Sequence, residues 1–327
     1  MDPFVSTGTL PPPEVAAALV TKAYERYRTN NDGECSSVYP VLAHVAPDLF
    51  RVCVTSVNGN GAFAGDVDAE FTIMSVAKPF VFALVGDALG APEVGRRVGV
   101  DATGLAFNSL AAVEQRGDGR TNPMVNPGAL VTTSLAPGRT GDERWRFILD
   151  GLSSFAGRPL ALHDEVYASA SATNHRNRAI ADLLESYALL GSDPDEALDL
   201  YTRQSSLRVT ARDLAVMGAT LADGGVNPVT GARVIGADSC RCTLAVMTTA
   251  GLYETSGDWL YRIGLPGKSG IGGGIVTIAP GKGGLGTFAP RLDAAGNSVK
   301  GQLVAEFLSR RLGLDIFVSQ PAGPSAP

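Results

Sequence analysis

Strand signals lie at both ends of this chain, whereas helical patterns fill its centre. The alternating, β-branched run Leu49–Val57 predicts a strand, and Gly59-Asn60-Gly61 predicts a hairpin turn into a second strand. Strand signals return at Ile275–Ala279 and Leu285–Ala289, separated by a turn. This distribution predicts an α/β (α+β) fold in which both ends of the sequence build one antiparallel sheet.

Amphipathic spacing predicts a helix at each end of the chain, from about Glu14 to Arg28 and from about Ser298 to Leu312, covering this sheet. Further helices are predicted at 75–89, 105–115, 145–154, 174–190, 194–203 and 211–222. We therefore expect a single domain over 1–319, with a sheet subdomain at about 14–74 and 261–315 and a helical insert subdomain at about 75–260. Residues 320–327, rich in Pro, Ser and Ala, predict a disordered tail.

The charge balance and the N-terminus limit the partners and the location of the chain. A net charge of −6 argues against nucleic-acid binding. The N-terminus has no basic and apolar signal region, and the apolar run Pro79–Leu89 is too short to span a bilayer. We expect a cytoplasmic protein that does not contact membranes. Because the chain has only three histidines and no second cysteine pair beside Cys240 and Cys242, no metal site is predicted.

The segment FTIMSVAK (71–78) places Ser-x-x-Lys at a strand-to-helix junction. Residues three apart share one helix face, so Lys78 can reach Ser75. A serine hydroxyl is a poor nucleophile until a base takes its proton, and a desolvated lysine with a lowered pKa can be that base. Pro79 favours a helix that begins close to Ser75, where free backbone N–H groups would face developing negative charge.

A second motif, Lys268-Ser269-Gly270, comes just before the C-terminal strands. Serine β-lactamases and penicillin-binding proteins pair S-x-x-K with K-[ST]-G on a strand that lines the same cleft. The surrounding stretch Leu265–Ile275 is dense in glycine, which lets backbone approach a ligand closely. The two motifs together predict a serine hydrolase acting on a small molecule.

These motifs belong to a longer ordered series: FNS (107–109), TNPMVNPGAL (121–130), VYAS with RNRAIA (166–181), the segment 199–225, GLYETSGDW (251–259), LPGKSGIGGGI (265–275) and GNSVKG (296–301). In this series the chain resembles the serine-dependent glutaminases over roughly residues 32–312. The resemblance implies a serine β-lactamase/penicillin-binding-protein-like fold and hydrolysis of L-glutamine to L-glutamate and ammonia. It also implies no cofactor, and assembly as a homodimer or homotetramer.

The resemblance implies a role for each matching residue. Ser75 would form the glutamyl-enzyme after activation by Lys78, and Tyr201 and Tyr253 would contact substrate and assist proton transfer. The other matching residues would bind or support the substrate. Asn126 and Asn177 would hold its α-carboxylate and amide by hydrogen bonds, and the backbone N–H of Ile271 would form an oxyanion hole with that of Ser75. Lys268 would add positive charge to the cleft, and Ser269 would hydrogen-bond within it. Without the resemblance, Asn126 would be interpreted as a turn residue before Pro127, and both tyrosines as core aromatics.

The chain departs from the family pattern at two places. Ala170 replaces the family glutamate that pairs with the α-ammonium of glutamine, and Val38 stands where the family has a pocket tyrosine, with Tyr39 one residue away. Burying an ammonium without its carboxylate costs several kcal/mol. We therefore expect an intact catalytic centre with impaired or altered recognition of free glutamine, unless Asp164 or Glu165 substitutes through a loop shift. The alternative substrate is a glutamine-like amide that lacks a free α-ammonium.

Two other functions remain as alternatives. A β-lactamase or peptidase would need a Ser- or Tyr-x-Asn element, and none occurs between Lys78 and Lys268. A catalytically impaired binding protein on the same fold would explain the changes at Val38 and Ala170. Retention of Ser75 together with Lys78 argues against that second alternative.

Overall fold

A five-stranded antiparallel sheet with the strand order β3-β2-β8-β7-β6 is the centre of the computed structural model, which describes residues 10–318. Its strands are β2 (Arg51–Ser56), β3 (Gly61–Ala64), β6 (Gly267–Ser269), β7 (Gly274–Ala279) and β8 (Gly283–Phe288). Two short pairs lie outside it, β1 (Glu34–Cys35) with β9 (Arg291–Leu292) and β4 (Phe71–Thr72) with β5 (Arg208–Val209). The prediction that both chain ends form one antiparallel sheet is confirmed.

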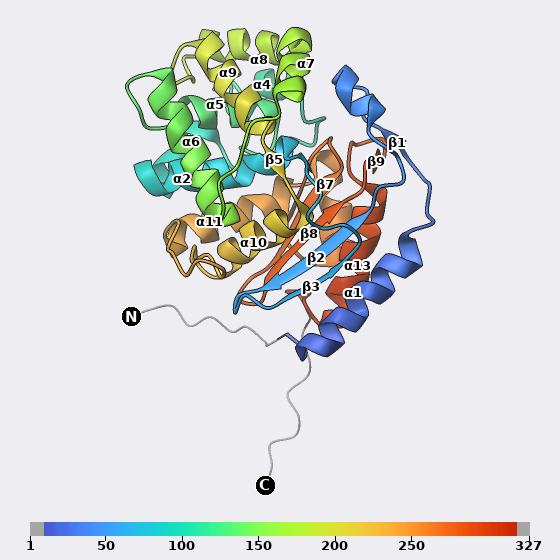
Figure 1. Ribbon diagram of the computed structural model, residues 1–327. Helices are drawn as coiled ribbons and strands as arrows, with labels where there is room; N and C mark the ends of the chain where they lie inside the picture. The colour runs from blue at the N-terminus through green and yellow to red at the C-terminus, as the bar shows by residue number, and fades with distance from the viewer. Residues whose placement is uncertain (1–9, 319–327) are drawn as a thin grey trace.

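Helices cover both faces of this sheet (Figure 1). The terminal helices α1 (Pro13–Tyr27) and α13 (Val299–Leu312) pack against each other on one face, and α10 (Ala211–Ala222) packs on the other against β2, β7 and β8. The remaining helices are α2 (Ala77–Leu89), α3 (Ala91–Val98), α4 (Ala111–Glu114), α5 (Asn126–Ser134), α6 (Gly141–Ala156), α7 (Asp164–Thr173), α8 (His175–Ser186), α9 (Pro194–Ser205), α11 (Ala237–Ala250) and α12 (Ser256–Ile263).

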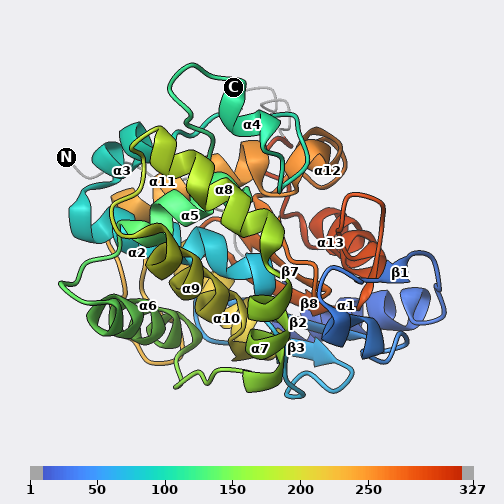
Figure 2. The ribbon, with the colours of Figure 1, turned by 90° about the horizontal axis from the view of Figure 1, so that it is seen from above.

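Alternate side chains of β7 belong to two separate cores. Val276 and Ile278 join a large core built mainly from the central helices, whereas Ile275 and Ala279 join a second core with α1 and α13. Successive strand side chains point to opposite faces. A strand that is buried on both faces therefore contributes side chains to a core on each side of the sheet. Figure 2 shows the central helices gathered beside the terminal ones.

Several helix predictions differ from the structure. The predicted helix at 105–115 is reduced to α4, because residues 105–110 form a loop in which the Phe107 carbonyl accepts a hydrogen bond from the Asn126 N–H (2.7 Å). The helix predicted at 174–190 ends at Ser186. Helices α3, α5, α7, α11 and α12 were not predicted. Four of them have ten residues or fewer, and helices this short depend on packing against neighbouring helices for their stability.

The division into a sheet subdomain and a helical subdomain stays a prediction. The tail predicted at 320–327 lies outside the described residues. Within residues 10–318, every helix is too short or too polar to cross a lipid bilayer.

Glycines of β8 determine how closely α10 approaches the sheet. A Cβ added at Gly286 would lie 2.7 Å from the Ala215 nitrogen and would also clash with the Ala211 carbonyl oxygen, both on α10. A Cβ at Gly284 would meet the α10 backbone in the same way. Any side chain at these positions therefore pushes helix and sheet apart.

We predict that Gly286→Ala destabilises the protein by roughly 1–3 kcal/mol, because overpacking a close backbone contact forces the α10 backbone to move. Urea unfolding followed by circular dichroism measures the change. Gly61→Ala, in edge strand β3 of the same sheet, is the matched control, since its Cβ would lie 3.6 Å from the nearest atom, the Val54 carbonyl oxygen. Equal stabilities for the two variants would contradict the prediction.

Candidate active site

Ser75 lies in a short 3₁₀ turn, Met74–Val76, that leads directly into α2. Residues 77–86 of this helix are all buried, so the apolar core fixes its position. Ser75 is 7% exposed and Lys78 is 1% exposed. The prediction of a helix that begins close to Ser75 is confirmed within two residues, and Pro79 occupies its first turn.

Burial of Lys78 changes its acid–base properties. Loss of solvation lowers the pKa of its amine from 10.5 to about 7. The amine nitrogen Nζ donates to Asn126 Oδ1 (2.6 Å) and to the Met124 carbonyl (3.5 Å). A neutral amine still has N–H groups for such bonds and keeps its lone pair. Lys78 can therefore be a base near neutral pH.

Two buried tyrosines flank the Ser75 hydroxyl. Burial raises the pKa of the Tyr201 phenol well above 10 and that of Tyr253 to about 12, and contact with the Ser75 side chain works in the opposite direction for both. The Tyr201 hydroxyl donates to Asn126 Oδ1 (3.0 Å), and the Tyr253 hydroxyl donates to the Ser269 carbonyl (3.1 Å). Both phenols are therefore protonated at neutral pH and can donate hydrogen bonds beside the Ser75 hydroxyl.

Tyr253 holds an unusual backbone conformation, with φ of +58°. For a residue with a Cβ this left-handed region costs about 1–3 kcal/mol, and the surrounding structure must hold it there. Met74, directly before Ser75, is also left-handed at +49°. Strain on both sides of the same hydroxyl is typical of a functional site.

A chain of amide side chains extends from Lys78 across the pocket. Asn126 Nδ2 donates to Asn177 Oδ1 (2.7 Å), and Asn177 Nδ2 donates to Asn174 Oδ1 (2.6 Å). Asn174 Nδ2 in turn donates to Thr202 Oγ1 (2.9 Å). The interpretation of Asn126 as a turn residue is wrong, because it is the first residue of α5, with Pro127 second, where the missing N–H is tolerated.

Ile271 lies on the pocket wall, as Ser75 does. The glycine before it allows the two segments to approach: a Cβ at Gly270 would lie 3.2 Å from the Ser75 nitrogen and 3.1 Å from the Ile73 carbonyl oxygen. Glycine at 270 thus permits a close approach between two segments of the chain, whereas the predicted approach of this backbone to a ligand stays a prediction. The oxyanion-hole role of Ile271 stays a prediction.

Lys268 and Ser269 lie in β6 and are fully buried. Lys268 Nζ donates to the Ser269 carbonyl (2.7 Å) and lies 4.0 Å from the centre of the Tyr253 ring. Desolvation, followed by the charge of Lys78, lowers the pKa of Lys268 well below 10.5. The Ser269 hydroxyl donates to the buried Asn297 Oδ1, outside the pocket wall, so its expected hydrogen bonding in the cleft stays a prediction. Burial works against the positive charge expected from Lys268.

The pocket above Ser75 includes both Val38 and Tyr39 in its wall. Tyr39 contacts Asn177, although burial is the larger influence and raises the pKa of its phenol. The expectation that Val38 leaves the pocket without its tyrosine is therefore wrong. The turn before the 3₁₀ helix Pro40–His44 directs the neighbouring Tyr39 inward, while Val38 is 49% exposed.

Ala170 is 2% exposed, on the buried side of α7 with Val166. The same helix contributes Thr173 to the pocket wall. Asp164 and Glu165, at the start of α7, are exposed and are not among the wall residues, so they do not replace the missing carboxylate. Within residues 10–318, the wall of this pocket has one charged side chain, Arg176, and no carboxylate.

Sequence reasoning missed two groups in the wall. The first is Asn174, which lies three residues before Asn177 and accepts a hydrogen bond from it. The second is Arg176, whose Nε donates to the Asn108 carbonyl (2.8 Å). The sequence assigns no role to either, although Arg176 begins the RNRAIA segment and Asn108 lies within the FNS segment. Within residues 10–318, His, Cys, Asp and Glu side chains form no group of three or more that could hold a metal ion.

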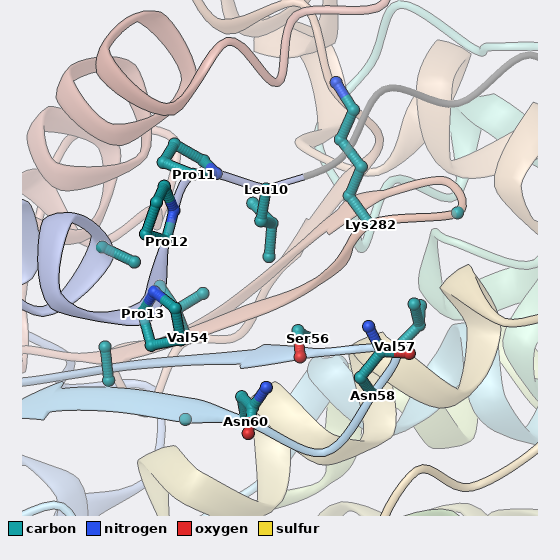
Figure 3. A pocket seen from close by; sticks show the side chains of 14 residues that line it. Leu10, Pro11, Pro12, Pro13, Val54, Ser56, Val57, Asn58, Asn60 and Lys282 are labelled. Carbon is teal, nitrogen blue, oxygen red and sulfur yellow. The ribbon is translucent and has the colours of Figure 1, made fainter.

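A larger cavity of about 510 Å³ lies at the sheet ends, away from Ser75. Figure 3 shows Pro11, Pro12 and Pro13 on one side of it and Lys282 on the other, with Val54 and Asn60 below. Within residues 10–318, no side-chain hydrogen bond joins the polar residues of its wall to one another. The Ser75 hydroxyl and the hydrogen-bonded amides line the smaller pocket, and Lys78, with its lowered pKa, donates to one of these amides, so we take the smaller pocket as the active site.

An S-x-x-K serine and lysine at the start of a buried helix, beside a K-S-G edge strand, define a serine hydrolase of the β-lactamase-like class. A family model described as Glutaminase matches residues 33–317. Glutaminase 2 of Yersinia pestis is 65% identical over 318 residues, which cover 97% of this chain and 94% of that protein. A Glutaminase of Brucella suis biovar 1 is 48% identical over 88% of this chain and 91% of its own length.

Solved structures agree with these sequence matches. The probable glutaminase YbaS superposes with a TM-score of 0.92 at 43% identity, covering 94% of this chain and 99% of that one. Bacillus subtilis glutaminase YbgJ, in its covalent complex with 5-oxo-L-norleucine, gives a TM-score of 0.83 at 30% identity over 92% of this chain and 99% of that one. The chain belongs to the glutaminase family and is a glutaminase, an amidohydrolase whose small-molecule substrate is glutamine.

The pKa of Lys78 predicts how activity depends on pH. Because the base must be neutral and its pKa lies at about 7, kcat/KM for glutamine should fall about tenfold per pH unit below that value and level off above it. Ammonia release measured from pH 5 to 9 tests this.

Variants identify the titrating group. Lys78→Arg should abolish the reaction because the guanidinium stays charged. Lys22→Arg, at an exposed lysine of α1, is the matched control. A rate that stays constant down to pH 5 would rule out Lys78 as the titrating base.

Proposed function

We propose that this glutaminase hydrolyses L-glutamine through an acyl-enzyme on Ser75, with Lys78 as the base. The observation that carries the proposal is the Ser75 hydroxyl, which contacts Tyr201 and Tyr253 and lies one helical turn from a lysine whose pKa is about 7. The proposed reaction consumes one water and yields L-glutamate and ammonia.

In the first half-reaction, Ser75 Oγ attacks the side-chain carbonyl carbon of glutamine while Lys78 Nζ accepts the hydroxyl proton. The oxyanion that forms would accept hydrogen bonds from the backbone N–H groups of Ser75 and Ile271. The C–N bond then breaks and the nitrogen leaves as ammonia. The additional proton that this nitrogen needs comes from Lys78 and is relayed through Tyr201 or Tyr253, whose hydroxyls flank Ser75.

In the second half-reaction, water attacks the ester carbonyl and gives its proton to Lys78, and Ser75 leaves with a proton restored to Oγ. Asn126 and Asn177 would hold the α-carboxylate and amide of the substrate. Their hydrogen bond to each other, and that of Asn126 to Lys78, support this role by fixing both amides before substrate binds. Assembly as a homodimer or homotetramer and a cytoplasmic location stay predictions.

We predict that Ser75→Ala lowers kcat by at least about 10³-fold, because no nucleophile remains. An electrophilic diazoketone analogue of glutamine should label the unaltered chain once per subunit and leave Ser75→Ala unlabelled, as mass spectrometry would show. Ser154→Ala, which removes an exposed hydroxyl from α6, is the control. Full ammonia release by Ser75→Ala would contradict the mechanism.

A second candidate substrate is an N-acyl glutamine, in which the α-ammonium is absent. The pocket wall favours it: within residues 10–318 this wall has no carboxylate, and Ala170 stands where the family glutamate pairs with that ammonium. An N-acyl glutamine has a negative α-carboxylate but no α-ammonium, so it would not need the carboxylate that is missing at position 170. The unaltered chain would then discriminate little between free and N-acylated glutamine.

We predict that Ala170→Glu raises kcat/KM for free glutamine relative to N-acetylglutamine by roughly tenfold or more, since an ammonium paired with a carboxylate gains at least ~1.4 kcal/mol. Ammonia release from each amide measures the ratio. Ala168→Glu adds the same charge at an exposed position of α7 and is the matched control. If both variants show the same ratio, Ala170 does not set the preference.

A further inference from the structure

Tyr253 keeps its hydroxyl beside Ser75 from a left-handed backbone conformation, so neighbouring groups must hold that segment in place. The tyrosine begins a three-residue 3₁₀ turn, Tyr253–Thr255. At the other end of its side chain, the hydroxyl donates to the backbone carbonyl of Ser269 in β6 (3.1 Å). The position of Tyr253 therefore depends on how the turn and β6 are connected.

Asn297 connects them. It lies in the loop between β9 and α13 and is completely buried. The Ser269 hydroxyl donates to Asn297 Oδ1, and Asn297 Nδ2 donates to Thr255 Oγ1 (3.0 Å). Thr255 Oγ1 donates onward to the carbonyl of Leu252, the residue before Tyr253 (2.7 Å). These bonds close a ring that begins and ends at the tyrosine.

The backbone of Asn297 is held independently of these side-chain contacts. Its backbone N–H donates to Asp293 Oδ1 (2.9 Å), and its carbonyl accepts from the Asp293 N–H (2.9 Å). The amide oxygen of Asn297 accepts a hydrogen bond and its amide nitrogen donates one, so the direction of each hydrogen bond in the ring is defined. Asn297 is not among the wall residues of the active-site pocket, so it acts through other groups.

We propose that Asn297, with Thr255, is a positioning residue that holds Tyr253 in its left-handed conformation and so keeps its phenol hydroxyl beside the Ser75 hydroxyl. The proposal rests on the serine mechanism above. Without the amide, Thr255 and Ser269 lose their common partner, and the turn can relax away from β6. The phenol would then leave the position from which it assists proton transfer, while the amides that bind substrate stay in place.

Asn297→Ala should lower kcat for glutamine by roughly 10- to 100-fold with a much smaller change in KM, because a displacement of about 1 Å has an effect of that size. Asn31→Ala, at an exposed asparagine, is the control. In a Tyr253→Phe background the same Asn297→Ala change should add little, since the two residues act as one unit. An equal loss in both backgrounds would overturn the proposal.

Thr255 supplies a second test if Asn297→Ala does not fold. Thr255→Val keeps the side-chain shape and removes the hydroxyl, so it should lose activity, whereas Thr255→Ser should keep most of it. Equal activities of Val and Ser variants would contradict the proposed ring. A crystal structure of Asn297→Ala or Thr255→Val with Tyr253 unmoved would overturn it whatever the activities are.

Labelling separates this proposal from the mechanism on which it rests. If the unaltered chain releases no ammonia and the diazoketone does not label Ser75, the serine mechanism fails. If the unaltered chain does both and Asn297→Ala matches it in kcat, only the role of Asn297 fails.

Discussion

The Asn126 side chain joins the parts of the active site. Its carbonyl oxygen accepts hydrogen bonds from Lys78 and Tyr201, and its amide nitrogen donates to Asn177. Four polar side chains that would each be costly to bury alone are therefore buried together with their partners satisfied. The arrangement also leaves the lysine dry enough to be neutral near pH 7. One amide thus connects the buried lysine and Tyr201 to a second asparagine of the pocket wall.

This polar cluster needs a rigid apolar surround, which the fold supplies from two directions. Helix α2 carries Lys78 and is buried on all sides along its first ten residues. Strand β6 carries Lys268 and Ser269 and is the edge of a sheet whose two faces belong to different cores. Close approach at Gly270 brings the loop after β6 against Ser75. The site therefore lies where the sheet and the central helices meet.

The two motifs could be predicted from sequence because each is local. Ser75 and Lys78 are three residues apart across the junction of a 3₁₀ turn and α2, and Lys268-Ser269-Gly270 is contiguous at the end of β6. Tyr39 was misjudged for the opposite reason. A one-residue offset in sequence says that Val38 replaces the tyrosine, whereas the turn before Pro40 puts Tyr39 against Asn177. The ring through Asn297 also could not be read from sequence, because Asn297 and its partner Thr255 are 42 residues apart.

By itself, the sequence determined the pattern of apolar residues, the order of strands and helices, and which residue types are available for chemistry. Side-chain period and short motif spacing act over a few residues, so they are legible without coordinates. Only the tertiary structure decided which polar groups are buried together. It brought Asn126, 48 residues along the chain, onto Lys78, and solvent exclusion then lowered the lysine pKa. Desolvation depends on every neighbour in space, and that is a property no local segment of sequence contains.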